Sequence, residues 1–206
     1  MLQLILAILV SYLLGSIPTA YIFGRCLKGI DIRRFGSGNV GATNAFRVLG
    51  KVPGIIILLL DILKGFVSVF FLGNLFKSKI DVSYEIILII LGLACISGHN
   101  WMIFLRFKGG KGVATSLGVL LAFATMIPSL RMVFFLVICS WLAIFLIFRI
   151  VSLASVLTGL SLPLYMIIFK QSLSLILTGV IIAIFILLRH RSNLKRILQG
   201  KEPRLF

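Results

Sequence analysis

Long apolar segments recur along the whole chain, separated by shorter polar connections. Each segment is near the ~20 residues that a helix, rising about 1.5 Å per residue, needs to cross roughly 30 Å of hydrocarbon. The segments lie near residues 2–24, 53–76, 84–105, 113–130, 132–148, 151–169 and 172–188. This pattern predicts an all-α integral membrane protein with seven transmembrane helices, in a single domain that covers residues 1–206.

Two details decide the predicted number of spans. The fourth and fifth segments are separated only by residues 128–131. Because their combined length far exceeds one crossing, the proline in this connection predicts a tight turn. Six crossings are the alternative, if one of the two helices is re-entrant. The first segment has neither a basic leader nor a small-residue cleavage site, so we expect a retained span rather than a signal peptide.

Composition and charge agree with a membrane as the main solvent, because 60% of the residues are hydrophobic and only 13% are charged. Lysine and arginine crowd the connections on one predicted side, which is cytoplasmic by the positive-inside rule. The opposite side has only Lys77, Lys79, Arg131 and Lys170. We therefore expect the N-terminus outside and the C-terminus in the cytoplasm. The net charge of +16 is spread over span ends, which favours lipids and anionic small molecules over nucleic acid as partners.

The first cytoplasmic connection, residues 31–47, is rich in glycine, serine and asparagine. Such a loop lets main-chain N–H groups approach an anion closely. If residues 40–49 form a short helix, then Thr43, Asn44 and Arg47 share one face of it. We interpret this loop as half of a phosphate site. The alternative is simple contact of its polar face with lipid headgroups.

The second cytoplasmic connection contains Lys111 among three glycines, directly before the segment that starts near residue 113. The unpaired N–H groups and positive dipole end of a helix N-terminus favour an anion there. The glycines allow close approach, and the lysine adds a full positive charge. The alternative is a positive-inside lysine among flexible glycines.

His99 and His190 are the only histidines in the sequence, and both fall on the predicted cytoplasmic side. Two histidines without cysteine or carboxylate companions leave a zinc site short of ligands, so no metal is expected. The basic C-terminal segment is expected to continue the last helix, which places His190 and Asn193 on one face. A polybasic tail that binds anionic lipid is the alternative for this segment.

Asp61 and Lys64 are one turn apart on the second span and too deep in the membrane to stay unpaired. We predict a mutual ion pair, with a catalytic role as the second interpretation. The cysteines lie in apolar surroundings without metal-type spacing, and we expect buried, unreactive thiols. They are Cys26, Cys95 and Cys139.

Several motifs occur in a fixed order along the chain. They are Gly36-Ser-Gly-Asn-Val-Gly-Ala-Thr-Asn44 with Arg47, Gly98-His99 followed by Phe107-Lys-Gly-Gly-Lys-Gly-Val-Ala-Thr115, and His190-Arg-x-Asn193-x-x-Arg196 with Gly200-x-Glu202. Gly15-Ser-Ile17 and Leu60-Asp61-x-x-Lys64-Gly65 accompany them. Together they resemble the bacterial glycerol-3-phosphate acyltransferases that use acyl phosphate, and the resemblance spans the whole chain.

The resemblance implies transfer of a fatty acyl group from acyl phosphate to the 1-hydroxyl of sn-glycerol 3-phosphate. The products are lysophosphatidic acid and phosphate, at the start of phospholipid synthesis. It also implies a multi-pass protein of the bacterial inner (cytoplasmic) membrane, with its active site facing the cytoplasm and no cofactor. The implied partners are the two substrates, membrane lipids and the enzyme that produces acyl phosphate.

The resemblance also assigns roles to residues. Catalytic roles are expected for Ser37, Arg47, Lys111, His190 and Asn193. Substrate-binding roles are expected for Gly36, Gly38, Asn39, Thr43, Asn44, His99, Gly109, Gly110, Gly112, Thr115 and Glu202. The division of these residues between the two phosphates stays open.

We expect direct attack of the acceptor hydroxyl on the acyl carbonyl, without an acyl-enzyme. The cysteines have no motif context, and Ser37 has no histidine and carboxylate near it in sequence, although folding can bring His190 to it. The base is either His190, because histidine titrates near about 6.5, or the acceptor's own phosphate. The second is preferred, with His190 orienting a phosphate.

The competing interpretation is a transporter or channel for organic phosphate, which would also place basic residues beside glycines. Transporters commonly show internal repeats and broken helices at the membrane midplane. Here we find no repeat, the polar groups gather at one face, and the midplane holds only Asp61 and Lys64. The sequence therefore favours an enzyme.

Overall fold

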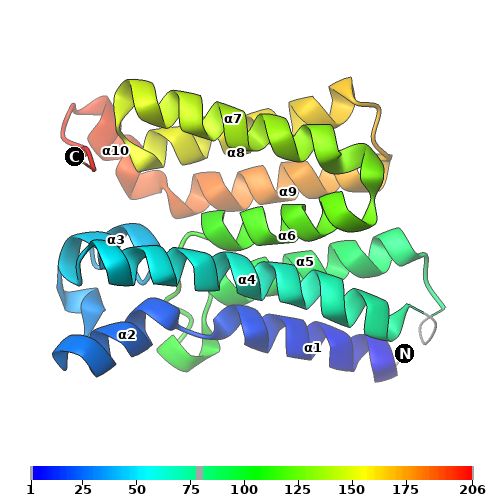
Figure 1. Cartoon of the computed structure of the whole chain (residues 1–206), viewed down its shortest axis with the longest axis horizontal. Helices are drawn as coiled ribbons and strands as arrows, with labels where there is room; N and C mark the ends of the chain where they lie inside the picture. The colour runs from blue at the N-terminus through cyan, green and yellow to red at the C-terminus, as the bar shows by residue number, and fades with distance from the viewer. Residues whose placement is uncertain (1, 78–80, 206) are drawn as a thin grey trace. The chain divides into compact units, whose positions relative to one another are not determined.

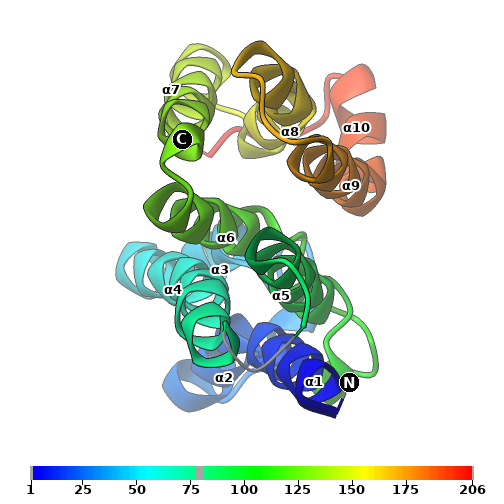
Figure 2. The same cartoon turned by 90° about the vertical axis from the view of Figure 1, so that its right-hand side faces the viewer.

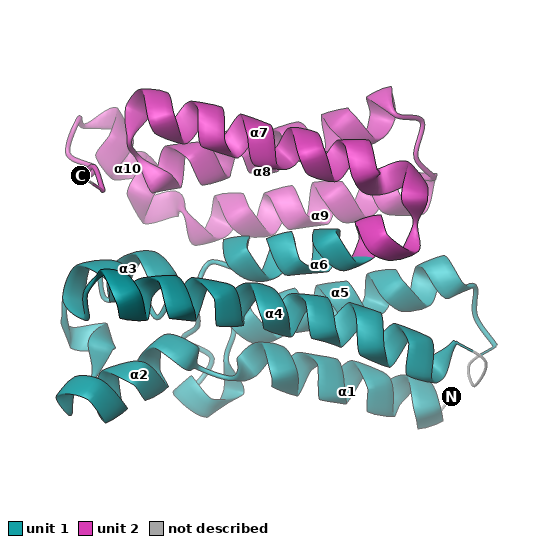
Figure 3. Cartoon of the chain, in the orientation of Figure 1, with its two compact units in different colours: residues 1–122 teal, residues 123–206 magenta. Residues whose placement is uncertain are grey.

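The computed structural model describes residues 2–77 and 81–205. It divides into two compact units, Met1–Ala122 and Phe123–Phe206 (Figure 3). Every regular element in the described part is a helix, as predicted. Lys79, assigned above to the outer side, lies outside the described residues.

Unit 1 contains the elements before the boundary, which falls inside α6 (Figure 1). They are α1 (Leu2–Ser16), α2 (Thr19–Lys28), η1 (Ile32–Arg34), α3 (Ala42–Val48), α4 (Lys51–Phe76), α5 (Tyr84–Asn100), η2 (Ile103–Leu105) and α6 (Val113–Met126). The helices α1, α4 and α5 pack against one another side by side (Figure 2). Glycines allow this close approach: a β-carbon on Gly15 would overlap the carbonyl of Cys95, and one on Gly98 would overlap that of Tyr12.

The first predicted span is confirmed as a candidate membrane span, Leu2–Lys28, but it contains a break that was not expected. The helix α1 ends at Ser16 and α2 begins at Thr19. Pro18 lacks an N–H group and disfavours the helical conformation in Ile17, the residue before it. Hydropathy does not detect this break because apolar residues continue on both sides.

Unit 2 is built from three long helices and a short terminal one. After η3 (Pro128–Leu130), they are α7 (Arg131–Phe148), α8 (Val151–Ile168), α9 (Leu173–Arg189) and α10 (Arg191–Leu198). The helix α8 packs against both α7 and α9. The C-terminal segment does not continue the last helix as expected, because α10 is bent from α9 by 63°.

All seven predicted apolar segments form helices, but fewer of them have the length of a membrane crossing. Among the described residues, five helices are long and apolar enough to cross, or six if α9 and α10 count as one bent span. The helix α6 has 14 residues, about 21 Å at the helical rise. The predicted tight turn before α7 is confirmed as η3.

The outer faces of the helices expose many large apolar side chains, as lipid contact requires. Cys95 is buried, but Cys26 and Cys139 are exposed, which corrects the expectation of three buried thiols. Apolar neighbours in sequence do not imply burial on a helix that faces lipid.

Candidate active site

The two glycine-bearing loops of unit 1 rest on one apolar cluster. Ile32 and Val40 of the first loop pack with Met102 and Leu105 of the second, over Ala20 of α2. The structure therefore brings together the two glycine-bearing motifs, although about 60 residues of sequence separate them.

The first loop is organised by Asn44, which is only 1% exposed. Its Nδ2 donates to the carbonyl oxygens of Ile32, Phe35 and Asn39 at 3.4, 3.1 and 2.9 Å. Its Oδ1 accepts a hydrogen bond from the N–H of Ser37 at 2.8 Å. Sequence reasoning expected Asn44 to bind substrate; the structure gives its amide these main-chain partners, and direct substrate contact stays a prediction.

The other expected residues of this loop surround Asn44. Gly36 and Gly38 have φ angles of 58° and 71°, in the left-handed region that favours glycine. Ser37 and Arg47 are exposed, whereas Asn39 and Thr43 are half-buried. The predicted short helix is confirmed as α3. The loop thus presents a serine and an arginine around a tightly turned main chain.

The second loop is held by the end of α5. The N–H of Gly110 donates to the carbonyl oxygen of His99 at 2.9 Å. A β-carbon on Gly110 would overlap Nε2 of His99, and one on Gly109 would overlap its carbonyl oxygen. Lys111, half-buried, follows directly before α6.

Buried polar atoms meet at the start of α6. The side chain of Asn100 is fully buried beside Gly112, which has a φ of 77°. Neither its Nδ2 nor its Oδ1 has a hydrogen-bond partner in the part of the chain that the structure describes. The same holds for Oγ1 of the buried Thr115. Asn100 was not among the predicted site residues, because nothing in its sequence context marks a buried amide.

The predicted ion pair is confirmed: Nζ of Lys64 lies 2.8 Å from Oδ1 of Asp61. Oγ1 of Thr19 donates to the same carboxylate oxygen at 2.7 Å. His99 joins the cluster, with its Nδ1 3.8 Å from that oxygen. Lys64 also donates to the carbonyl of Ile17 at the break between α1 and α2, at 3.3 Å.

In unit 2, His190 occupies the joint between α9 and α10 and is 2% exposed. Its Nδ1 lies 2.8 Å from the carbonyl oxygen of Ile186. Because a carbonyl only accepts, this contact places a proton on Nδ1, and Nε2 of the neutral ring then carries the lone pair.

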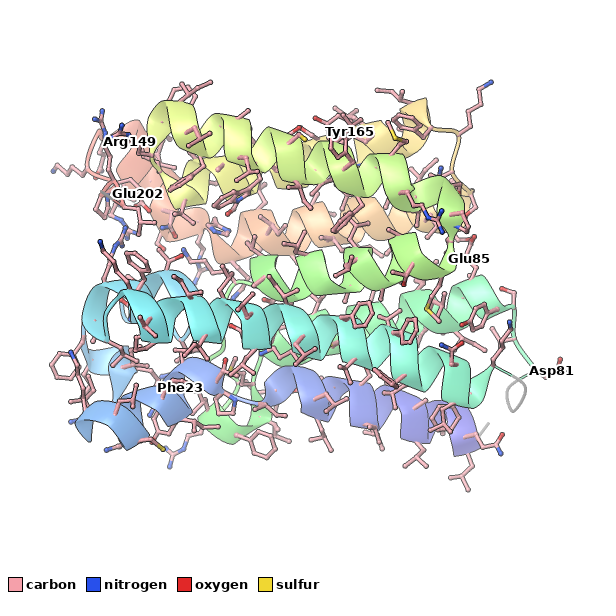
Figure 4. All side chains as sticks on the ribbon, viewed as in Figure 1. Phe23, Asp81, Glu85, Arg149, Tyr165 and Glu202 are labelled. Atoms are coloured by element: carbon pink, nitrogen blue, oxygen red, sulfur yellow. The ribbon has the colours of Figure 1, made fainter. Side chains whose placement is uncertain are left out.

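Glu202 fastens the C-terminal tail within unit 2, at the end of the unit where Figure 4 labels Arg149 and Glu202. Its Oε1 accepts from Nδ2 of Asn193 at 2.5 Å and from Oγ of Ser152 at 2.8 Å. Its Oε2 accepts from Nε of Arg196 at 2.7 Å. Burial raises the pKa of Glu202, but these hydrogen bonds and the charge of Arg196 outweigh it, and the pKa is lowered.

Across residues 2–77 and 81–205, no group of three or more histidine, cysteine or acidic side chains is arranged to hold a metal ion. The cationic side chains instead lie beside glycine-rich main chain, which is the chemistry of an anion site.

The apolar helices and the two basic, glycine-bearing loops on one apolar cluster define an all-helical membrane protein with a candidate anion site. The chain is a member of the glycerol-3-phosphate acyltransferase family, whose sequence model, described as "Glycerol-3-phosphate acyltransferase", matches residues 5–200.

Relatives of this family cover almost the whole chain. A glycerol-3-phosphate acyltransferase of Desulforamulus reducens is 41% identical over 198 residues, with 96% of this chain and 93% of the relative covered. A glycerol-3-phosphate acyltransferase 2 of Moorella thermoacetica is 43% identical over 201 residues, with 98% and 97% covered. A crystal structure of PlsY (YgiH), an integral membrane glycerol 3-phosphate acyltransferase in its glycerol 3-phosphate form, is 40% identical. It superimposes with a TM-score of 0.85 over 98% of this chain and 94% of that one.

Proposed function

We propose that this protein transfers a fatty acyl group from acyl phosphate to the 1-hydroxyl of sn-glycerol 3-phosphate, as a first step of phospholipid synthesis. The products are lysophosphatidic acid and inorganic phosphate. The carrying observation is the pair of basic, glycine-bearing loops on one apolar cluster, in a chain of the glycerol-3-phosphate acyltransferase family. The PlsY structures, solved in glycerol 3-phosphate and lysophosphatidic acid forms, support this acceptor and this product.

The reaction needs positioning and charge neutralisation more than a cofactor. The acceptor oxygen forms an ester bond to the acyl carbon, the bond from that carbon to the phosphate oxygen breaks, and a base takes the hydroxyl proton. Acyl phosphate is a mixed anhydride and already contains a good leaving group. Arg47 and Lys111 supply positive charge for the two phosphates, and charge-assisted contacts of this kind contribute about 1.5 to 3 kcal/mol each.

The residues of the two loops offer different groups to the substrates. In the first loop, Ser37 offers an exposed hydroxyl, while Gly36 and Gly38 offer close approach of main-chain N–H groups, with Asn39 and Thr43 alongside. In the second, Gly109, Gly110 and Gly112 let the main chain beside Lys111 pack closely on His99 and Asn100. The hydroxyl of Thr115 and the amide of Asn100 offer buried polar atoms at the first turn of α6.

His190 is suited to accept the hydroxyl proton. Its Nδ1 shares a proton with the carbonyl of Ile186, which makes Nε2 the basic nitrogen of the neutral tautomer. On the basis of this tautomer we favour His190 over the acceptor's own phosphate as the base. A His190→Ala variant should bind both substrates normally yet lose turnover, together with the acidic limb of its pH–rate profile. Retained turnover with an unchanged limb would return the role to the substrate phosphate.

Asn193 and Glu202 act together in the tail. The amide of Asn193 donates to Glu202, which also binds Ser152 and Arg196. In this proposal Glu202 fixes the direction of the Asn193 amide, and both residues act in positioning a phosphate.

The acyl group passes directly between substrates. Cys95 is buried, and Ser37 lies on a loop held by an asparagine rather than by a histidine and a carboxylate. Mass spectrometry of enzyme quenched with acyl phosphate alone should find unmodified protein. An acylated Ser37 or cysteine would overturn direct transfer.

The membrane arrangement follows the positive-inside rule. In this proposal the protein has seven crossings, α6 included, in the bacterial inner membrane, with the N-terminus outside and the site and C-terminus in the cytoplasm. Asp81 and Gln199 are both exposed. An Asp81→Cys variant should react with an impermeant thiol reagent from outside, and a Gln199→Cys variant only from inside. The native exposed Cys26 and Cys139 are first replaced by serine. The reverse labelling would overturn the orientation.

The test of donor choice uses purified protein in lipid nanodiscs. Acyl phosphate, supplied in the cell by the enzyme that forms it, should acylate labelled glycerol 3-phosphate without coenzyme A. Efficient reaction with acyl-coenzyme A alone would contradict the proposal.

One observation favours a second function, transport of an organic phosphate. The break between α1 and α2 faces Lys64 and thereby resembles the broken helices of transporters. Uptake of glycerol 3-phosphate into proteoliposomes without acylation would support it.

A further inference from the structure

We propose that Asp61 positions the Lys111 loop through His99, and is a positioning residue of the acyltransfer site although it lies on a membrane-spanning helix. The inference rests on the proposed function for its kinetic test. Its structural test stands without that function.

A hydrogen bond and an ion pair hold the carboxylate of Asp61 in place independently of His99. It is 1% exposed, and its Oδ1 receives both the hydroxyl of Thr19 at 2.7 Å and Nζ of Lys64 at 2.8 Å. Lys64 is fixed in turn by the carbonyl of Ile17 at 3.3 Å. Two helices and a helix break therefore hold one carboxylate oxygen in place.

The imidazole of His99 joins this carboxylate to the second loop. Its Nδ1 faces Oδ1 of Asp61 at 3.8 Å, and the ring is only 3% exposed. The opposite edge of the ring, Nε2, lies against the α-carbon of Gly110, where a β-carbon would overlap it. The position of the ring therefore limits the position of Gly110.

The main chain makes a second link at the same place. The N–H of Gly110 donates to the carbonyl of His99 at 2.9 Å, and Gly109 also packs on that carbonyl. Lys111 is the next residue. A shift of the His99 ring is thus transmitted through one peptide unit to the main chain of Lys111.

A purely structural ion pair is the competing explanation. Apolar residues of similar volume commonly hold two buried segments at least as well as a buried ion pair does. Stability alone therefore does not explain why a carboxylate faces His99. The carboxylate faces His99, the residue that contacts the glycine loop. This placement favours a role in positioning the loop.

The structural test is hydrogen–deuterium exchange of the full chain in nanodiscs. The variant is Asp61→Asn with Lys64→Met, because it removes the carboxylate without leaving a buried lysine unpaired. Exchange in residues 101–112 should accelerate at least about tenfold. The reason is that His99, whose carbonyl accepts from the N–H of Gly110, is no longer held by the carboxylate. The control is Ser68→Ala, which removes the 2.5 Å hydrogen bond between Ser68 of α4 and Ser11 of α1 but touches neither His99 nor the loop. Unchanged loop exchange in the double variant, or equal acceleration in the control, would overturn the proposal.

The kinetic test is a double-mutant cycle with Lys111→Ala. In the wild-type background the Asp61/Lys64 variant should lower kcat/KM by at least about tenfold, mainly by raising the KM of the substrate whose KM Lys111→Ala also raises. In the Lys111→Ala background it should lower kcat/KM by no more than about threefold. An equal loss in both backgrounds would mean a structural role. If the wild-type protein acylates no glycerol 3-phosphate, the proposed function fails, and the exchange result alone decides whether Asp61 holds the loop.

Discussion

The two loops of unit 1 rest on the same apolar cluster but are held in different ways. The first is held by a side chain of its own, because the amide of Asn44 binds three carbonyls and one N–H of the loop. The second is held from outside, by the main chain and ring of His99 at the end of α5. The comparison shows that two loops on one apolar cluster can be held differently, one by its own side chain and one by the end of a long apolar helix.

This difference has a consequence for substitutions. A change inside the first loop should act through hydrogen bonds, because its partners are polar and local. A change in the second should act through packing, because the space between Gly110 and His99 is already filled.

The largest effect is expected for Gly110→Ala. The added β-carbon overlaps a ring that is buried, and overpacking of this kind costs about 1 to 3 kcal/mol. The acyltransfer assay should show kcat/KM reduced roughly 30-fold or more. The matched control is Gly41→Ala in the first loop, whose β-carbon meets only Nδ2 of Asn39 at an ordinary 3.5 Å. Equal losses in both variants would remove the distinction between the loops.

Asn44→Asp should have the next largest effect. The carboxylate keeps the acceptor for Ser37 but removes the donor to three carbonyls, which costs about 1 to 3 kcal/mol. We expect kcat/KM to fall about tenfold, with faster hydrogen exchange in residues 32–39. The control is Asn74→Asp, an exposed residue whose amide donates only to Phe70. Exchange in the variant as slow as in wild type would show that the first loop does not depend on the side chain of Asn44.

Glu202 extends the comparison to a tail that is held by a carboxylate. Since its pKa is lowered from the ordinary 4.5, its stabilisation is complete above that pH and is lost as the pH falls through the lowered value. Glu202→Gln should cost about 1 to 2 kcal/mol, or roughly 2 to 8 °C in Tm. Wild-type protein should lose more of its Tm in acid than the variant does. A Tm of the variant that falls as steeply in acid would assign the acid sensitivity to another group.

The smallest effect is expected for Arg33→Gln at the start of the first loop. A hydrogen bond from the Arg33 side chain, together with its charge, lowers the pKa of Asp31 from 3.8 to about 2. The stabilisation from this pair is present above pH 3.8 and is lost as the pH falls toward 2. In the variant, NMR of labelled aspartate should show the pKa of Asp31 raised toward its ordinary value, with kcat/KM within about twofold of wild type. A large loss of activity would show that the loop depends on this ion pair rather than on Asn44.

Much of the fold and site follows from the sequence alone. Helices respond to apolar length and to proline and glycine, so all seven apolar segments and α3 were predicted. Asp61 and Lys64 were paired correctly, because hydrocarbon leaves two charges one turn apart no other stable arrangement.

Other features were missed for different reasons. The break at Pro18 has a local cause in the proline, but the apolar stretches on both sides hide it from hydropathy. The bend at His190 has neither glycine nor proline to mark it, and nothing in the sequence around Asn100 marks a buried amide. The hydrogen bonds of Asn44 and the contact of His99 with Asp61 join residues whose spacing has no helical period. The motif resemblance identified most of these residues without giving their partners.

The most direct test of the account follows two labels through one turnover. Purified protein in nanodiscs receives glycerol 3-phosphate labelled in its carbon atoms and acyl phosphate labelled in its phosphorus, without coenzyme A. We predict that lysophosphatidic acid carries only the carbon label and that inorganic phosphate, carrying the phosphorus label, forms in equal amount. Phosphorus label in the lipid product, or no lysophosphatidic acid from acyl phosphate, would contradict the account.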